Sequence, residues 1–464
     1  MSTPAGRPGT HRGDLDEVGE RLFARGIAVS EGGDGRSALV RANSVIVDGR
    51  FDQGRRRSIE RAVGEFRNAR IKPVSRRQRV DLQVVEFDPE QRGEHRRRRW
   101  TVEPVAEIVE RLSEFGARPN HVLLAEQSMT GSPGPLHQVG DLSFPGHVIE
   151  ATDPAGEIVS LLLNTSQPAD APPLRQPLKA RGRRRPRVLV VDTGLRTRRG
   201  NGKRVEHPDL THAVRIDPPW TDDPDVDAKD HEDEATADGF PDLLDYGAGH
   251  GTFVAGVVRQ QCPDAEITPV GALTSFCDGD EASVVAALTE ARGRVESGAC
   301  EPFDICVMSL GGYYTSDDPG ILADVWPDLV GDMLVVAAAG NADSDRRFFP
   351  AALDGVVAVG ALDHRGKGWY SNYGGWVDAC APGIDVVSTY FTDFAEALPP
   401  GCALDPRTYA GWATWSGTSF TAPKVAGVLA QEMYLTGCSA HDAWAAMSAP
   451  ERFRLPDLGV VVNV

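Results

Sequence analysis

The sequence predicts an α/β protein with two domains, in which a small α/β domain precedes a larger three-layer α/β/α domain built on a mostly parallel sheet. The length of 464 residues exceeds that of one typical domain. A proline- and arginine-rich stretch without periodicity, residues 164–187, separates two regions of strand and helix patterns. We therefore expect an N-terminal domain at 1–163, an extended linker at 164–187 and a second domain at 188–464.

In the first domain, short apolar runs indicate strands, and apolar residues that recur every three or four positions indicate helices. The expected strands are Ser44–Val47, Val84–Phe87, His121–Leu124 and Ile158–Leu161. The apolar faces of the expected helices are formed by Ile59, Val63 and Phe66, and by Val105, Ile108, Val109 and Leu112. Thr101 is a plausible N-cap for the second helix.

In the second domain, the apolar runs are continuous rather than alternating, which indicates strands buried on both faces of a parallel sheet. The expected strands are Val188–Val191, Ile305–Met308, Leu334–Ala338 and Val356–Val359. Helices are expected at Ala282–Val295, from His250 onward and at Ser419–Tyr434. Helices between buried strands predict the layered arrangement named above.

The two halves of the chain differ in charge. Residues 1–187 hold 31 Lys and Arg against 25 Asp and Glu, a net charge of +6, whereas the remaining residues hold 18 against 42, a net charge of −24. An acidic second domain argues against nucleic acid as its ligand. Opposite charges also favour docking of the N-terminal domain on the second domain within one molecule.

Two arginine runs, Arg55–Arg57 and Arg96–Arg99, have neither interleaved aromatic residues nor a recognised nucleic-acid motif around them. We interpret them as a solvated face or an intramolecular contact, and expect no nucleic-acid partner. Residues Met1–Val18 contain no apolar run, and no stretch of about 18 apolar residues exists for a membrane helix. The expected location is therefore cytoplasmic, with the seven cysteines reduced.

Three polar residues stand where strands end or helices begin, each among small residues. Asp192 lies in Val-Val-Asp-Thr-Gly, His250 in Gly-His-Gly-Thr and Ser419 in Ser-Gly-Thr-Ser-Phe-Thr-Ala-Pro. Taken singly, they have ordinary explanations as a turn carboxylate, a structural histidine and an N-cap serine. Taken together, they supply a nucleophile, a base that accepts its proton and a carboxylate that orients the base. We predict that they form a catalytic triad.

With these motifs in this order, residues 187–464 resemble the subtilisin-like serine proteases, the subtilase family, in which the triad follows the chain order Asp, His, Ser. Ala-Ala-Ala-Gly-Asn at 337–341, His-Pro-Asp-Leu at 207–210 and Ala-Pro-Gly at 381–383 extend the resemblance. It implies a serine endopeptidase that acts on proteins or peptides through an acyl-enzyme. Phe253 stands where many members carry a second histidine.

The resemblance also implies an oxyanion hole and a substrate-binding edge. Asn341 and the backbone N–H of Ser419 are the expected oxyanion donors, and the start of a helix at Ser419 adds a positive dipole end. The expected substrate-binding residues are Ser309, Leu310, Gly311, Gly312, Ala338 and Gly340. An extended peptide bound along this edge would be recognised through its main chain. A plain turn at the two adjacent glycines is the alternative.

No metal or other cofactor is predicted, with calcium as the alternative. The segment Asp222–Asp245 is dense in carboxylates, but its spacing does not match the calcium-loop pattern. Asp209 occupies a position that resembles a calcium ligand of the family. The loop that would complete such a site is missing, because Cys262 and Pro263 follow the His250 helix at once.

Two questions of function stay open at the level of sequence. The alternative to the endopeptidase is a catalytically inactive subtilase-fold module that only captures peptides. The N-terminal domain is a prosegment, an inhibitor or an adaptor, and its basic charge suits docking on the acidic second domain.

Overall fold

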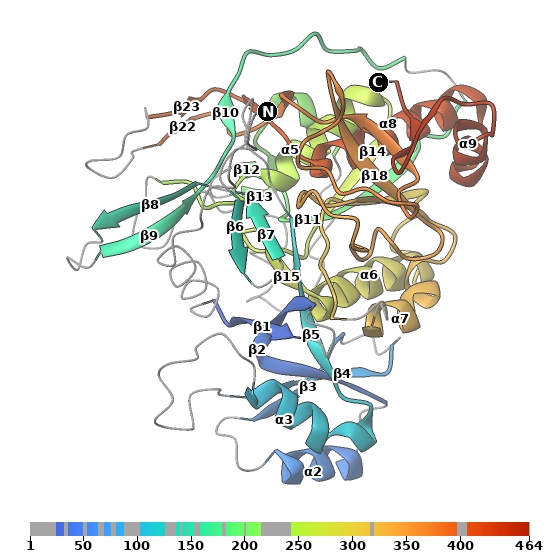
Figure 1. Cartoon of the computed structure of the whole chain (residues 1–464). Coiled ribbons are helices and arrows are strands. Elements are labelled where there is room, and N and C mark those ends of the chain that lie inside the picture. Colours follow the sequence, from blue (N-terminus) through green and yellow to red (C-terminus); the bar gives the residue numbers. More distant parts are fainter. Residues whose placement is uncertain are drawn as a thin grey trace, which may run out of the picture.

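The computed structural model places a small N-terminal sheet beside a larger α/β region, with the sheet at the bottom of Figure 1. The structure describes residues 25–31, 36–49, 53–63, 69–75, 80–87, 103–125, 136–139, 142–145, 147–152, 158–178, 182–198, 201–214, 243–315, 320–396 and 406–463.

The N-terminal sheet is antiparallel, with the order β15-β5-β2-β4-β3, and β1 pairs with β2. Its strands are β1 (Ile27–Glu31), β2 (Ser37–Asp48), β3 (Arg70–Pro73), β4 (Leu82–Glu86), β5 (Arg118–Leu124) and β15 (Asp278–Asp280). Two helices, α2 (Gln53–Ala62) and α3 (Glu103–Arg111), pack their apolar residues against β2 and β4, and the 3-10 turn η2 (Ser113–Phe115) follows α3. This core confirms the expected helix faces, although Phe66 and Thr101 lie outside the described residues.

The larger region is built on a nine-stranded sheet with the order β14-β11-β16-β17-β18-β20-β26-β25, in which β19 pairs with β18. Neighbours from β14 to β26 are parallel, and the pairings of β19 and β25 are antiparallel. The strands are β11 (Arg187–Asp192), β14 (Glu266–Gly271), β16 (Ile305–Met308), β17 (Leu334–Ala338), β18 (Val356–Asp363), β19 (Gly366–Lys367), β20 (Ala379–Pro382), β25 (Arg454–Leu455) and β26 (Gly459–Val461). The four strands expected here are confirmed.

Alternate residues of the central strands face opposite helical layers. Val188 and Val190 of β11 belong to the core cluster that contains α5 (His250–Gln261), α8 (Thr418–Thr436) and α9 (Ala440–Met447). Leu189 and Val191 belong to a second cluster with α6 (Glu281–Glu296) and α7 (Gly320–Val330). Helices therefore cover both faces of a mostly parallel sheet, as the continuous apolar runs predict.

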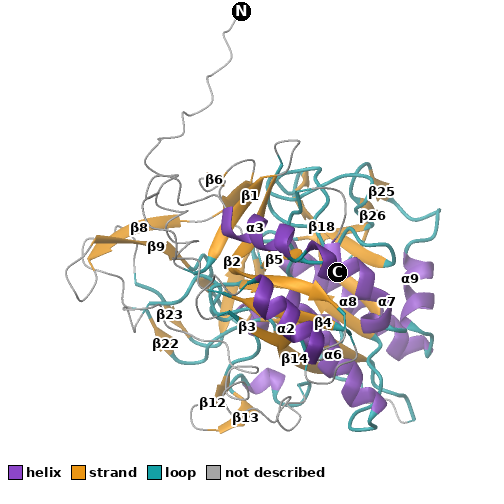
Figure 2. Ribbon diagram, turned by 90° about the horizontal axis from the view of Figure 1, so that it is seen from below, coloured by secondary structure: helices purple, strands orange, loops and turns teal. Residues whose placement is uncertain are grey.

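Smaller sheets lie around this body. They are the sheet β10-β24-β21 and the hairpins β6–β7, β8–β9, β12–β13 and β22–β23. Their bounds are β6 (Leu136–Val139), β7 (Leu142–Pro145), β8 (His147–Thr152), β9 (Ile158–Leu163), β10 (Gln167–Pro168), β12 (Thr197–Arg198), β13 (Asn201–Val205), β21 (Val386–Thr389), β22 (Phe394–Ala395), β23 (Thr408–Tyr409) and β24 (Trp412–Trp415), with the 3-10 turn η3 (Pro208–Leu210) after β13. Figures 1 and 2 both show the β8–β9 hairpin projecting from the body.

The start of the expected linker is part of the larger region rather than a free connector. β10 pairs with β24, and the side-chain amide of Asn164 donates to the carbonyl oxygens of Asp245, Tyr246 and Ala248 at 3.1–3.2 Å. Because Asn164 satisfies several buried carbonyls at once, this segment is held in place by polar contacts that proline content does not reveal.

The two regions also share a sheet, since β15 of the larger region pairs with β5 of the N-terminal sheet. The run Arg55–Arg57 is involved in contacts inside the chain, where Arg55 donates to the carbonyl of Phe115 and Arg56 pairs with Glu60. Arg96–Arg99 lies outside the described residues. Within the described part of the chain, no disulfide joins the cysteines and no helix is long and apolar enough to cross a bilayer.

Candidate active site

Asp192 and His250 form a buried pair where β11 ends and α5 begins. His250 Nδ1 lies 2.7 Å from Asp192 Oδ1, which also accepts the backbone N–H of Thr193 at 2.8 Å. Both side chains are fully buried. A Cβ on Gly251 would come within 2.1 Å of Gly194 O, so glycine at this position lets the helix approach the strand end. A carboxylate oxygen accepts hydrogen bonds, so Nδ1 is assigned as the donor to Asp192 and Nε2 is left as the basic nitrogen.

The imidazole of His250 is surrounded by aromatic rings next to Ser419. Its ring centroid lies 5.4 Å from that of Phe420, the residue after Ser419, and 5.7 Å from that of Trp415. Within the part of the chain that the structure describes, His250 Nε2 is buried and has no hydrogen-bond partner. The structure thus brings the predicted base beside the first turn of α8.

Phe253 completes this aromatic cluster. It is fully buried, and its ring centroid lies 4.5 Å from Phe420 and 5.7 Å from Trp415. Phe253 therefore packs against the same two rings that contact the imidazole of His250. Pattern reasoning did not single out Trp415 or Phe420, whose role depends on contacts between α5, α8 and β24.

Ser419 is held by reciprocal contacts with Ser309 at the end of β16. Ser419 Oγ donates to Ser309 O at 3.2 Å, and Ser309 Oγ donates to Ser419 O at 2.7 Å. Both residues are buried. The predicted substrate-binding residue Ser309 thus uses its side chain to fix the start of α8.

Asn341 is oriented by the residue that precedes Ser419. Its Oδ1 accepts from the backbone N–H of Thr418 at 2.9 Å and from Thr418 Oγ1 at 2.8 Å. Two donors on one atom identify it as the oxygen, so the NH₂ group of the side chain faces the other way. Thr418 thus orients the side chain of Asn341, and sequence reasoning missed this contact although Thr418 lies inside the Gly-Thr-Ser motif.

Gly311 pairs with β5 from the side opposite β15, and we call the position that β5 occupies between Gly311 and β15 the groove. Its N–H donates to Leu124 O at 2.9 Å, and its carbonyl accepts from Leu124 N–H at 2.7 Å. Gly312 pairs instead with Phe349, and a Cβ there would lie 2.6 Å from Val122 O. Of the other predicted substrate-binding residues, Leu310 is buried in the core cluster of α6 and α7, Ala338 is buried at the end of β17, and Gly340 is buried just after it.

The opposite edge of the groove is β15, which sequence analysis did not identify. β15 pairs with β5 through Asp278–Leu124, Gly279–Leu123 and Asp280–Val122, and Cys277 O accepts from Ala125 N–H at 3.0 Å. β5 therefore lies as an extended strand between β15 and Gly311. The available signal was Asp280, which caps α6 by accepting from Ser283 N–H and so marks an extended segment just before the helix.

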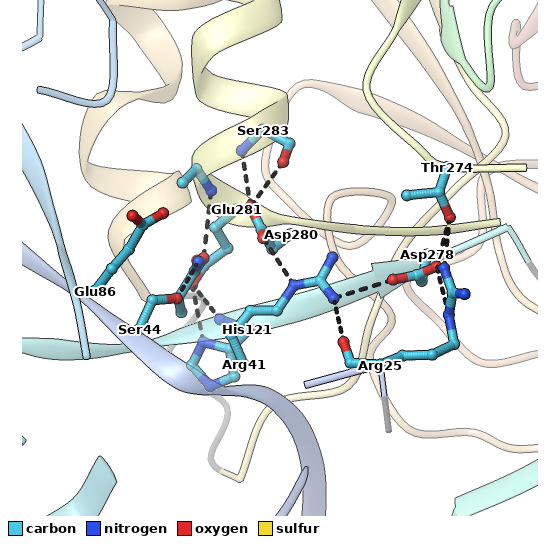
Figure 3. A network of polar contacts seen from close by, with 12 residues as sticks. Arg25, Arg41, Ser44, Glu86, His121, Thr274, Asp278, Asp280, Glu281 and Ser283 are labelled. Atoms are coloured by element: carbon cyan, nitrogen blue, oxygen red, sulfur yellow. Dashed lines mark hydrogen bonds and ion pairs between the residues drawn. The ribbon is translucent and has the colours of Figure 1, made fainter. Parts of the chain in front are cut away.

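Charged residues of the two regions meet at this groove (Figure 3). Arg25 and Arg41 pair with Asp278, Arg41 also pairs with Asp280, and His121 contacts Glu281. Burial by itself would raise the pKa of Asp278, but the two arginines outweigh burial and hold that pKa below its ordinary value. The opposite charges predicted from the two halves thus meet at the edge of the groove.

The profile of the subtilase family (peptidase S8) matches residues 183–442, more than half of the chain. The chain belongs to the subtilase family. Sequence analysis had predicted this family from the three motifs, and the prediction is confirmed.

This subtilase is similar to several proteinases. It is 31% identical over 255 residues to a thermophilic serine proteinase of Bacillus sp. (strain AK1), covering 52% of this chain and 51% of that protein. It is 30% identical to an intracellular serine protease of Paenibacillus polymyxa and to thermitase of Thermoactinomyces vulgaris, covering 68% and 72% of those proteins and 54% and 52% of this chain. The chain spans about half the length of the first of these relatives.

The contacts of Asp209 do not fit a calcium site. Asp209 Oδ1 lies 3.3 Å from Nη2 of Arg259 on α5. The guanidinium of Arg259 thus already pairs with the carboxylate that would have to bind calcium. Among the described residues, no group of three or more His, Cys, Asp or Glu side chains is arranged to hold a metal. Most of Asp222–Asp245 lies outside the described residues, so the prediction of no cofactor stays a prediction.

Proposed function

We propose that this subtilase is a serine endopeptidase that cleaves proteins or peptides through Asp192, His250 and Ser419. The observation that carries the proposal is the buried Asp192–His250 pair, whose basic nitrogen has no partner among the described residues and whose ring packs beside the residue after Ser419. Relatives that are named serine proteases support the same activity.

In this mechanism, Ser419 Oγ attacks the carbonyl carbon of the substrate while His250 Nε2 takes the hydroxyl proton. Asp192 keeps the proton of the imidazole on Nδ1 and stabilises the imidazolium that forms. His250 then donates the proton to the leaving amine, which departs and leaves an acyl-enzyme on Ser419. Water, activated by the same base, hydrolyses this ester and regenerates the enzyme.

The side-chain amide of Asn341 and the backbone N–H of Ser419 would stabilise the negative oxygen of the tetrahedral intermediate. Thr418 supports this role because it holds Oδ1 of Asn341 and so directs the NH₂ group away from itself. Ser419 lies in the first turn of α8, where the helix dipole favours negative charge. A donor already oriented before the reaction costs no reorganisation in the transition state.

The N-terminal sheet would restrain this activity by occupying the groove. β5 pairs with β15 on one side and with Gly311 on the other, which is how an extended substrate would be recognised through its main chain. A substrate strand could therefore pair with β15 and Gly311 only after β5 has dissociated from them. The N-terminal region therefore acts as an intramolecular inhibitor in this proposal.

Labelling with a fluorescent fluorophosphonate, which reacts with activated serines, tests the proposal. The full-length protein should become labelled over hours as the groove opens transiently, and peptide mapping should place the label on Ser419. The Ser419→Ala variant should not be labelled, whereas Ser297→Ala, a change at an exposed serine, should be labelled like the parent. Equal labelling of the parent and Ser419→Ala would reject the nucleophile and favour an inactive peptide-binding module.

A further inference from the structure

The acidic edge of the groove is neutralised in this structure by residues that a substrate would displace. Asp278 and Asp280 lie on β15, and their carboxylates pair with Arg25 and Arg41 of the N-terminal region at 2.5–3.0 Å. The side chain of Asp278 is 4% exposed and that of Asp280 is 14% exposed. When a substrate replaces the N-terminal strand, these two carboxylates lose their partners and need other cations.

The position of Arg41 shows where such a cation would lie. Arg41 is on β2, and the strand order β15-β5-β2 places β5 between Arg41 and the two carboxylates. Its guanidinium must therefore reach across β5 to contact Asp278 and Asp280, as Figure 3 shows. Val122 and Leu124 lie on one face of β5. A positive group above that face can therefore reach Asp278 and Asp280.

The register between β5 and β15 identifies the substrate positions concerned. Directly opposite residues of an antiparallel pair point to the same face and approach each other closely. Leu124 is opposite Asp278 and Val122 is opposite Asp280. A substrate strand in the same register would present its side chains at these two positions to the two carboxylates.

Val122 and Leu124 share their face with Tyr313 and Phe348 as well as with the two carboxylates, whereas the residue between them lies on the other face of the strand. Leu123, opposite Gly279, is fully buried in the apolar cluster of α6 and α7, with Leu310 and Tyr314. A strand that alternates its faces would therefore place an apolar side chain in this cluster and its neighbours over the acidic edge.

We propose that Asp278 and Asp280 determine substrate specificity, by selecting peptides with lysine or arginine at the positions of Val122 and Leu124, on either side of an apolar residue at the position of Leu123. The inference rests on the proposed peptidase function of the groove. In this proposal, Arg25 and Arg41 take the place of the basic side chains of a substrate. This explains why arginines pair with Asp278 and Asp280 while β5 occupies the groove.

A competition assay on the full-length protein tests this selectivity. Quenched-fluorescent octapeptides copy residues 121–128 of the chain, with Lys, Gln or Glu at the positions of Val122 and Leu124. The ratio of kcat/KM for two competing peptides does not depend on the fraction of enzyme whose groove is open. The Lys peptide should be preferred over the Glu peptide by about tenfold or more, because opposite charges attract across a strand pair and like charges repel.

The double variant Asp278→Asn, Asp280→Asn should bring this ratio close to one. Asp354→Asn, at an exposed aspartate, serves as the matched control and should keep the ratio of the parent. Equal cleavage of the Lys, Gln and Glu peptides by the parent would overturn the proposal while leaving the peptidase function intact.

A second measurement does not depend on catalysis, so it tests the role of Asp278 and Asp280 even if the protein cleaves no peptide. In the Ser419→Ala chain, Arg25→Ala removes one partner of Asp278 and should increase amide hydrogen exchange of β5 several-fold. Adding Leu124→Lys should restore protection, whereas Leu124→Glu should reduce it further and Leu124→Met should have little effect. Leu124 is only partly buried, so a charged side chain is tolerated there. Equal exchange in the Lys and Glu variants would overturn the proposal, even if the peptidase function also failed.

Discussion

Leu124 and Gly311 exchange two backbone hydrogen bonds, so a strand of the N-terminal region is paired with the predicted substrate-binding edge. The N–H of Leu124 donates to Gly311 O at 2.7 Å, and the N–H of Gly311 donates to Leu124 O at 2.9 Å. A substrate strand bound at this edge, as we propose, would need the same backbone groups.

Leu124→Pro should increase the rate of peptide cleavage by the full-length protein, by about tenfold or more. Proline has no N–H to donate to Gly311 and does not fit the interior of a paired strand, so β5 should leave the groove more often. The measurement is the initial rate on a quenched-fluorescent peptide, with Leu124→Met as a control that keeps both backbone bonds. An unchanged rate in the proline variant would indicate that the N-terminal region does not inhibit.

Asn341→Ala should lower kcat by about 100- to 1000-fold with little change in KM, the range measured for removing a side-chain oxyanion donor. The amide bonds to the oxygen mainly in the transition state, so ground-state binding should change little. Steady-state kinetics with one peptide check this expectation, and circular dichroism shows whether the fold is kept. An effect on KM alone would make Asn341 a residue for substrate binding instead.

Acid should weaken the docking of the N-terminal region on the groove. Arg25 and Arg41 hold the pKa of Asp278 below its ordinary value in the docked state. The stabilisation from this shift is therefore present above the ordinary pKa of about 4 and is lost as the pH falls through the lower docked-state pKa. Protection factors of β5 amides at pH 7, 5 and 3 measure it, and Asp278→Asn should flatten the dependence. High salt should act less strongly, because the pair is mostly buried.

Arg407→Ala should destabilise the protein by about 3–5 kcal/mol, the usual loss when one partner of a buried ion pair is removed. Arg407 pairs with the buried carboxylate of Glu396 and donates to the carbonyl oxygens of Asn164 and Ser166 at 2.8 and 2.7 Å. The free energy of unfolding from denaturant titration checks the value, and Arg407→Lys should lose less. A loss below about 1 kcal/mol would mean that the segment from Asn164 is held mainly by other contacts.

Chelation should not destabilise the part of the fold around Asp209. Its carboxylate pairs with the mostly buried guanidinium of Arg259, so EDTA should leave the melting temperature unchanged within about 2 °C. Arg259→Ala should lower stability, because the carboxylate would then lack this partner. Differential scanning calorimetry measures both effects. A large EDTA effect in the parent would show a metal site elsewhere in the chain.

Much of the larger region could be predicted because its signals are local. Strands such as Ile305–Met308 and Leu334–Ala338 are continuous apolar runs, and the structure has them with these same bounds. The candidate residues Asp192, His250 and Ser419 stand in short motifs at element ends, where parallel α/β sheets place their sites. For this reason the family and the candidate triad follow from the chain order alone.

The sheet of the N-terminal region could be predicted only in part. The sequence predicts the elements that became β2, β4, β5, α2 and α3, but it shows no sign that β15 completes their sheet. β15 has three residues, two of them aspartates, and no apolar pattern. Its strand conformation depends on pairing with β5, a segment far away in the sequence, so local propensity could not reveal it.

The sequence by itself therefore determined the fold class, the family and the residues available for catalysis, because apolar periodicity and small-residue motifs are read from neighbouring positions. Only the tertiary structure decided how those residues are placed. Thr418 orients Asn341, aromatic rings of β24 and α8 pack against His250, and β5 fills the groove between β15 and Gly311. These relationships are contacts between segments that are distant in the sequence. Backbone N–H and C=O groups are the same in every sequence, so only the packing of the chain decides which of them meet.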